Sequence, residues 1–113
     1  MAGVPELTVA MVRRYCDDKV PPQHRDQLRV ECGVRGRSIT IYDCQASWHP
    51  DLQPDWSRVP IAQLRYDPDG HRWRLFYSDR NSRWHPYDMV GPTRGLADLL
   101  AEIDADPTGI FWG

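Results

Sequence analysis

The chain has 113 residues, of which 41% are hydrophobic and 27% are charged, and its formal net charge is −2 at pH 7. This length suits one domain, and the hydrophobic share excludes a disordered chain because enough apolar surface is available for a core. The nearly neutral charge excludes a polycation that binds nucleic acid or membranes through bulk charge, so any basic surface must be local. We expect a single domain over residues 1–113.

The cysteines and the N-terminal sequence indicate the cellular compartment in which the protein is expected. Cys16, Cys32 and Cys44 form no CxxC pair, and neither they nor the four histidines have the spacing of zinc ligands. No secretory signal precedes the first predicted helix, and the longest apolar run, residues 9–12, is far shorter than the roughly 20 residues of a membrane span. The sequence therefore predicts reduced cysteines, a cytoplasmic location, no membrane association, no metal and no cofactor.

The first predicted element is a helix from Glu6 to Lys19. Its apolar positions recur with helical spacing at Leu7, Met11 and Tyr15, which predicts that this stripe faces the core. The prolines at positions 21 and 22 end the helix, because the residue before a proline is disfavoured in the α region.

Two strands joined by a tight turn are predicted next, because the polarity of the chain alternates from residue 28 onward. In the first strand the inward positions are Leu28, Val30, Cys32 and Val34. In the second, after a turn at Gly36, the inward positions are Ile39 and Ile41. This pattern is typical of a half-buried antiparallel hairpin.

The segment between Gln45 and Arg58 is too long for a simple hairpin connection and is predicted to be a loop. Its two tryptophans, a histidine and an arginine are candidate binding residues: Trp48, His49, Trp56 and Arg58. The two rings are expected either to wall a pocket for a flat or cationic ligand or to cap the open end of the core.

Three further strands are predicted, from Val59 to Tyr66, from Arg72 to Ser78 and from Arg83 to Tyr87. In the first turn between them, Gly70 is expected to supply a positive φ, and in the second turn Asn81 is expected in the left-handed region. Pro86 lacks a backbone N–H and therefore places the last strand at an edge of the sheet.

The second predicted helix has the clearest amphipathic pattern in the chain. Its apolar positions are spaced i, i+3, i+4 and i+7, at Leu96, Leu99, Leu100 and Ile103. Asp98 and Glu102 fall on its solvent side, and Pro107 and Gly109 close it. The segment 110–112 that follows is too apolar to stay in water, so we expect it to dock on the domain.

The order of these elements is α-β-β-β-β-β-α. We expect an α+β fold with a single five-stranded antiparallel, meander-like sheet. The N-terminal and the C-terminal helix are expected to pack together on one face of this sheet.

Several segments of the chain are distinctive: Val20-Pro21-Pro22 with Arg25-Asp26-Gln27, Val34-Arg35-Gly36, Asp79-Arg80-Asn81 with Arg83-Trp84-His85, and residues 104–113. With them the chain resembles, over nearly its whole length, a family of short bacterial proteins catalogued only as a domain of unknown function. The resemblance supports the fold class and the compartment and implies no activity. At the position after the Arg-Asn pair, where the family is expected to carry glycine, this chain has Ser82.

Strict alternation assigns the strand residues to two faces. If Leu64 and Leu75 face the helices, the opposite face gathers arginines and aromatic rings, with these candidate binding residues: Arg29, Arg65, Arg72, Arg74, Phe76, Arg83, His85 and Tyr87. Such a face is typical of modules that bind single-stranded nucleic acid, with rings against bases and guanidinium groups against phosphates. The alternatives are a solvated face with arginines paired to acids such as Glu31, or a surface for a protein partner.

One hairpin has the residue types needed for acid-base chemistry on a phosphate: Asp79, Arg80, Asn81, Arg83 and His85. These residues are also typical of an ordinary turn, and no second carboxylate is placed beside them. We therefore assign no catalytic residue and favour a binding domain that contacts nucleic acid. The alternatives are a protein-interaction or homodimerisation module and, third, a small hydrolase or nuclease.

Overall fold

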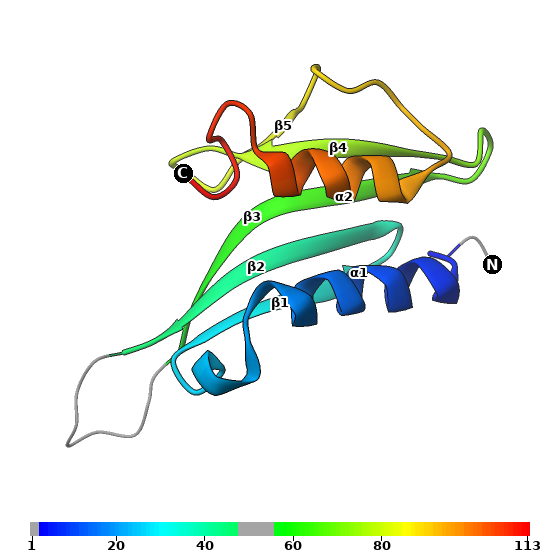
Figure 1. Cartoon of the computed structure of the whole chain (residues 1–113). Helices are drawn as coiled ribbons and strands as arrows, with labels where there is room; N and C mark the ends of the chain where they lie inside the picture. The colour runs from blue at the N-terminus through cyan, green and yellow to red at the C-terminus, as the bar shows by residue number, and fades with distance from the viewer. Residues whose placement is uncertain (1–2, 48–55) are drawn as a thin grey trace.

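A computed structural model describes residues 3–47 and 56–113. Within these residues, five strands form one antiparallel sheet in the order β1-β2-β3-β4-β5, and two helices cover one of its faces (Figure 1). The elements are α1 Glu6–Lys19, the 3-10 helix η1 Pro22–His24, β1 Leu28–Arg35, β2 Ser38–Ala46, β3 Trp56–Asp67, β4 Arg72–Ser78, β5 Trp84–Pro86 and α2 Leu96–Ala105. The predicted α+β meander is confirmed. None of the described helices is long and apolar enough to cross a membrane.

The two edges of the sheet differ in length. The edge strand β1 pairs with β2 over eight residues, whereas β5 has three residues, and its Pro86 lies opposite Phe76 of β4. The edge position predicted from Pro86 is confirmed. Gly36 has φ of +58° in the turn between β1 and β2, a conformation that costs glycine little because it has no Cβ.

A bulge in β3 changes which side chains share a face. Ile41 of β2 lies opposite Ala62 and Tyr42 lies opposite Pro60, so Ile61 is an extra residue in β3. Because the extra residue shifts the alternation by one, Trp56, Arg58 and Pro60 lie on the same face as Gln63 and Arg65. The loop predicted from Gln45 to Arg58 is wrong at both ends, since β2 continues to Ala46 and β3 begins at Trp56. Trp48 and His49 lie outside the described residues.

The core lies between the sheet and the helices. The predicted stripe of α2 is confirmed, because all four of its apolar residues are buried. The predicted stripe of α1 is wrong for two of its three residues: Leu7 and Met11 are 85% and 44% exposed, whereas Tyr15 packs against the core. Val12 and Cys16 are the buried residues of this helix. These two short side chains, one turn apart, belong to the core cluster.

Two tight turns place the positive φ one residue later than predicted. His71, and not Gly70, has φ of 50°, and its Nδ1 lies 3.1 Å from the hydroxyl of Tyr66. Ser82, and not Asn81, has φ of 61°, and its amide donates to the carbonyl of Asp79. A three-residue hairpin loop commonly ends in a left-handed residue, which explains why glycine suits the position of Ser82.

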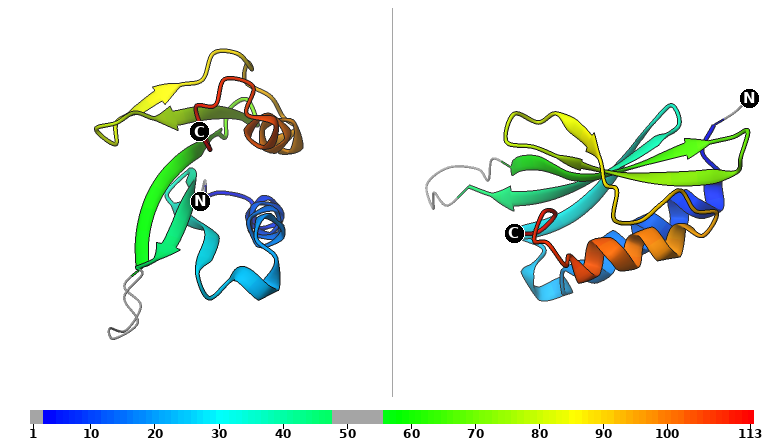
Figure 2. Two further views of the ribbon diagram at one scale, coloured as in Figure 1. Left: turned by 60° about the vertical axis from the view of Figure 1, so that its left-hand side comes forward. Right: turned by 90° about the horizontal axis from the view of Figure 1, so that it is seen from above.

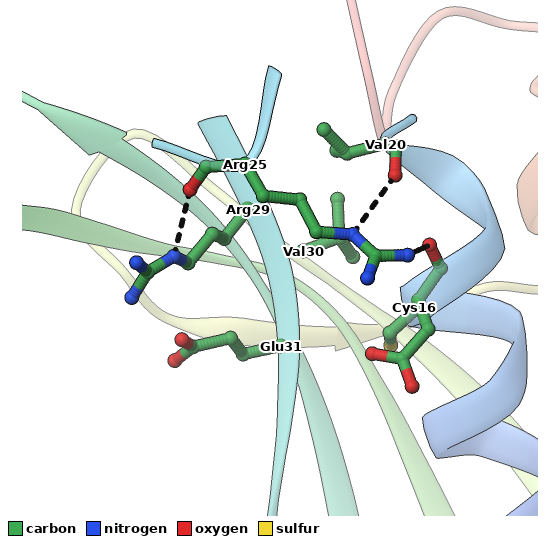
Figure 3. Close-up of a pocket in the computed structure, with 7 residues that line it drawn as sticks. Cys16, Val20, Arg25, Arg29, Val30 and Glu31 are labelled. Carbon is green, nitrogen blue, oxygen red and sulfur yellow. Dashed lines mark hydrogen bonds between the residues drawn. The ribbon is translucent and has the colours of Figure 1, made fainter. Parts of the chain in front are cut away.

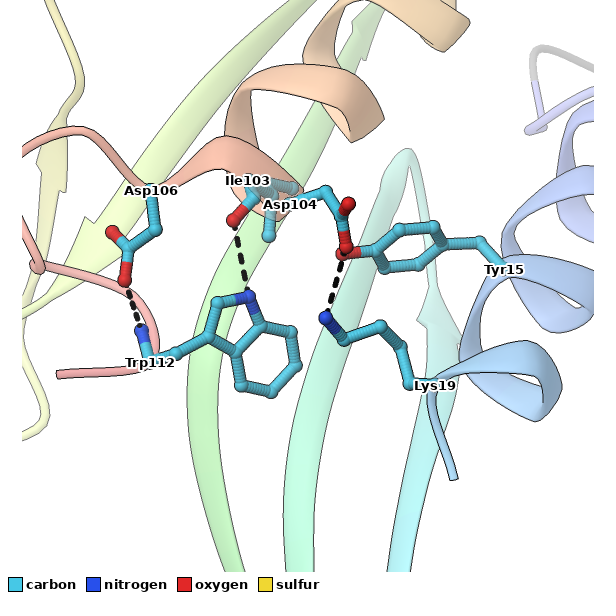
Figure 4. Close-up of polar contacts among 6 residues, drawn as sticks. All are labelled: Tyr15, Lys19, Ile103, Asp104, Asp106 and Trp112. Atoms are coloured by element: carbon cyan, nitrogen blue, oxygen red, sulfur yellow. Dashed lines mark hydrogen bonds and ion pairs between the residues drawn. The ribbon is translucent and has the colours of Figure 1, made fainter. Parts of the chain in front are cut away.

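The C-terminal segment docks as predicted and joins the two helices (Figure 4). The amides of Phe111 and Trp112 donate to the Asp106 carboxylate at 3.0 and 2.8 Å, and the Trp112 indole N–H donates to the carbonyl of Ile103 at 3.0 Å. Lys19 of α1 lies 2.9 Å from the Asp104 carboxylate of α2 and 4.7 Å from the Trp112 ring centre. These contacts of Lys19, Asp104 and Trp112 form what we call the helix-side clamp.

Candidate functional site on the open face of the sheet

Both described helices lie on the same side of the sheet, so its other side, which we call the open face, is free of helix (Figure 2). In the described strands, this face carries six arginines and two acids: Arg29, Arg35, Arg58, Arg65, Arg72 and Arg74, with Glu31 and Asp67. Six positive charges and two negative charges leave this face with a local charge of +4, although the whole chain carries −2. Arg29, Arg65, Arg72 and Arg74 are therefore on the predicted face.

The first of three guanidinium–ring stacks joins β1 to β3. The guanidinium carbon of Arg29 lies 4.2 Å from the centre of the Trp56 ring, and its Nε–H donates to the carbonyl of Arg25 at 2.9 Å (Figure 3). Arg25 in turn donates to the carbonyls of Asp17 and Val20 at the end of α1, at 2.9 and 3.2 Å. Arg29 is thus held by two contacts before any ligand arrives.

The second stack lies at the centre of the open face. The guanidinium carbon of Arg58 is 3.7 Å from the centre of the Tyr42 ring, and the Arg58 Nε lies 4.0 Å from the Glu31 carboxylate. Gly33 of β1 lies beside them, and a Cβ at that position would be 3.4 Å from the Tyr42 ring and 3.5 Å from an Arg58 nitrogen. The missing side chain lets the Tyr42–Arg58 stack lie close to the backbone of β1.

The third stack covers Phe76, which is only 7% exposed although it lies on the open face. The guanidinium carbons of Arg65 and Arg74 lie 3.8 and 5.8 Å from its ring centre. The Arg65 Nε–H donates to the Gln63 side-chain carbonyl at 2.7 Å, and the Gln63 amide donates to Thr40 at 3.0 Å. Phe76 is on the predicted face, but its ring already has a partner and supports the arginines.

A stacked guanidinium group keeps most of its N–H groups available. Arginine presents five N–H donors in the plane of the group, and stacking occupies only a flat side of that plane. Holding the side chain in place beforehand reduces the entropy lost when an anion binds. The three stacks therefore form an array of arginine donors suited to phosphate groups, which accept two parallel hydrogen bonds from one guanidinium.

A hollow of about 460 Å³ lies beside the second stack. It is lined by residues of four strands, among them Gly33, Thr40, Tyr42, Arg58, Gln63 and Trp84. Tyr42, Gln63 and Trp84 were not among the candidate binding residues. Alternation with the inward Ile41 places Tyr42 on this face, so the sequence pattern contains a signal for it. In the last strand, the prediction assigned the odd-numbered residues to the open face and therefore missed Trp84.

Three candidate binding residues lie elsewhere. Tyr87 is 5% exposed and belongs to the core, where its ring centre is 5.0 Å from that of Phe111 and its hydroxyl donates to Glu102 at 2.7 Å. His85 lies opposite Tyr77, which packs against the core cluster, so it is on the helix-covered side. Arg83 precedes β5 and lies in the turn. His85 and Tyr87 thus alternate with Trp84, and the predicted faces of this segment are reversed.

The Asp79–His85 pair closes the turn between β4 and β5. One Asp79 carboxylate oxygen accepts from the amides of Asn81 and Arg83 at 2.8 and 3.0 Å, and the other lies 2.7 Å from His85 Nε2. The hydrogen bond with His85, followed by the amide of Arg83, lowers the pKa of Asp79 from 3.8 to about 2. Both oxygens are engaged, so the carboxylate holds the hairpin together.

Comparison with known proteins gives one match. The family model described as a domain of unknown function (DUF3024) matches residues 3–113. No curated protein and no solved structure matches the chain.

Proposed function

The chain belongs to the DUF3024 family, and we propose that its open face binds single-stranded nucleic acid. The observation that supports this proposal is the set of three guanidinium–ring stacks on one uncovered side of the sheet. Among the described residues, one carboxylate lies within ion-pair distance of a stacked arginine: Glu31 is 4.0 Å from Arg58. This pair is at the limit of ion-pair distance, so Arg58, like the other stacked arginines, keeps charge available for a polyanion.

The distribution of acidic residues supports the same partner. Residues 93–113 contain four acids and one arginine, and they form α2 and the C-terminal segment on the opposite side of the sheet: Asp98, Glu102, Asp104 and Asp106, with Arg94. Positive charge is therefore concentrated on one side of the molecule and negative charge on the other, although the net charge is close to zero. An approaching polyanion is attracted to the open face and repelled by the α2 side, which orients it before contact.

A single strand fits this surface better than a duplex. Reading a duplex requires an element that enters a groove, usually a helix or a two-stranded ribbon, and the open face is a broad sheet surface. A single strand presents unpaired bases and phosphates to the same surface, as in other sheet-based binding modules. Hydrolysis is not part of the proposal, because the Asp79 carboxylate is already engaged in the hairpin.

The proposal is tested by fluorescence anisotropy with labelled single-stranded DNA and RNA over a series of salt concentrations. If about three phosphates are contacted, log K is expected to fall with log salt with a slope of about −2. Arg58→Gln is expected to reduce the magnitude of this slope by roughly 0.7 and to weaken binding of all sequences similarly, because one phosphate contact is lost. Arg14→Gln on α1 is the matched control. Absence of binding in low salt would exclude the proposal.

Self-association is the second candidate function. The observation that favours it is β1, an eight-residue edge strand whose Leu28 and Val34 are 42% and 45% exposed. Such an edge can pair with another chain. Phe76 and Tyr87 are already covered within the chain, so they would not supply the contact. Light scattering on the eluting protein is expected to give the monomer mass, and a dimer mass independent of concentration would favour this alternative.

A further inference from the structure

The hollow on the open face lies next to two features of the strands, a bulge in β3 and a glycine in β1. The bulge at Ile61 places Pro60 and Gln63 on the same face in β3, and Gly33 contributes no side chain from β1. Its volume of about 460 Å³ is within the range of pockets that take small molecules, about 300–1,000 Å³. The space is therefore large enough for one flat ring system.

Trp84 differs from the other aromatic residues of the open face. Among the described rings there, Trp56, Tyr42 and Phe76 are each covered by a guanidinium group within 4.2 Å. Trp84 is half-buried, lines the hollow, and has no such cation over it in the described part of the chain. Of the described rings on this face, Trp84 is thus the one that a ligand ring can contact without displacing a guanidinium group.

The polar side of the hollow retains hydrogen-bonding capacity. Gln63 uses one amide N–H for Thr40 and accepts one hydrogen bond from Arg65. A side-chain amide has two N–H donors and two acceptor lone pairs, so one of each remains. These two groups are suited to the edge of a nucleobase, which presents donors and acceptors side by side.

We propose that this hollow holds one unstacked base of a bound single strand, with the base ring against Trp84 and its edge toward Gln63. The inference rests on the proposed function and deepens it, since it assigns bases to the hollow and phosphates to the stacked arginines. Arg58, which lines the hollow and stacks on Tyr42, is placed to contact a phosphate of the same nucleotide. Base stacking on an aromatic side chain tolerates different bases, so weak sequence preference is expected.

The experiment uses the full chain and a single-stranded oligonucleotide that contains 2-aminopurine, whose fluorescence is quenched by stacking. Trp84→Ala is expected to abolish the quenching and to weaken binding about tenfold. Trp84→Phe keeps a ring and is expected to retain most of both signals. Gly33→Val, which adds a strand-favouring side chain at the hollow, is expected to reduce both, and its thermal unfolding reports whether it folds.

An oligonucleotide without bases separates the two proposals, because it carries phosphates alone. It is expected to bind the wild-type chain and Trp84→Ala equally, and to bind Arg58→Gln more weakly. If oligonucleotides with bases bind in a salt-dependent way but Trp84→Ala and Gly33→Val leave quenching and affinity unchanged, the base subsite is wrong and the proposed function stands. If no oligonucleotide binds in low salt, both are wrong.

Discussion

The helix-side clamp and the stacks of the open face use the same contact, a cation over an aromatic ring, in different electrostatic surroundings. Lys19, the single lysine of the chain, lies over Trp112 and is paired at 2.9 Å with Asp104. On the open face, Arg65 lies over Phe76 and its Nε contacts the neutral side chain of Gln63. On the helix side the cation over the ring is neutralised by a close acid and has a structural role. On the open face the nearest acid to Arg58 is 4.0 Å away, and Arg65 contacts a neutral side chain, so these cations remain available to an anion.

The helix-side clamp and the stacks of the open face also differ in which elements they connect. The helix-side clamp connects α1, α2 and the C-terminal segment, which are distant in the sequence. The pKa of Tyr15 is raised, first by its burial and then by Asp104, so its hydroxyl stays protonated and donates to that carboxylate. Lys19 in turn lowers the pKa of Asp104. The stacks of the open face lie within one sheet whose strands are already held together by backbone hydrogen bonds, so their loss should affect stability less.

The largest effect is expected from charge reversal on the open face. Arg58→Glu combined with Arg65→Glu should weaken single-stranded DNA binding more than a hundredfold in low salt, because two contacts become repulsive. The free energy of unfolding, measured in urea, should fall by about 1 kcal/mol for each lost stack. Arg14→Glu with Arg94→Glu changes the net charge equally and is the control. Equal loss of binding in both variants would show that net charge alone drives it.

The next effect is expected on the helix side. Trp112→Ala removes a half-buried ring and the hydrogen bond to Ile103, and should lower the free energy of unfolding by about 2 kcal/mol. DNA affinity of the folded protein should remain unchanged, because the open face is not altered. Urea unfolding and anisotropy on the same preparation measure both quantities. A loss of affinity without a loss of stability would contradict the division between the two faces.

A smaller gain is expected at the hairpin between β4 and β5. Ser82 has φ of 61°, so Ser82→Gly relieves a conformation unfavourable to residues with a Cβ and should raise the free energy of unfolding by about 0.5–1 kcal/mol. Asn81→Gly, one residue earlier, should give no gain and serves as the matched variant. Thermal unfolding distinguishes the two. Equal stabilisation by both would argue against the left-handed conformation at position 82.

The smallest effect is confined to acid pH. The pKa of Asp79 is lowered in the folded chain from 3.8 to about 2, so its ionised form contributes stability above about pH 4 that is lost as the pH falls toward 2. Asp79→Asn lacks this contribution. The difference in melting temperature between wild type and variant should therefore shrink between about pH 5 and about pH 2. A difference that is constant over this range would contradict the role of the carboxylate.

Most elements could be predicted from local pattern, because alternation and helical spacing depend on neighbouring residues. The bounds Glu6–Lys19 and Arg72–Ser78 match α1 and β4 as predicted. The core-facing side of α1 could not be predicted from hydrophobicity alone. Leu7 and Met11 are the more apolar stripe, but the close approach to β1 selects the shorter Val12 and Cys16.

The sequence predicts the type of the candidate site, a sheet face with arginines and aromatic rings, but only some of its residues. Arg29, Arg65 and Arg74 follow from alternation, whereas the bulge at Ile61 reverses the face of Arg58 and Trp56. Its one mark in the sequence is Pro60, since a proline inside a central strand indicates a bulge. Whether a ring is covered depends on how a long arginine side chain lies across neighbouring strands. Phe76 is therefore covered and Trp84 is not, a distinction that only the three-dimensional arrangement supplies.

The most direct test of nucleic-acid binding by the open face follows the arginine side chains themselves by NMR, through their Nε–Hε signals, as single-stranded DNA is added in low salt. The signals of Arg29, Arg58 and Arg65 are expected to shift, and those of Arg14 and Arg94 are expected to stay in place. Absence of shifts, or shifts of Arg14 and Arg94 as large as those of the stacked arginines, would contradict binding at the open face.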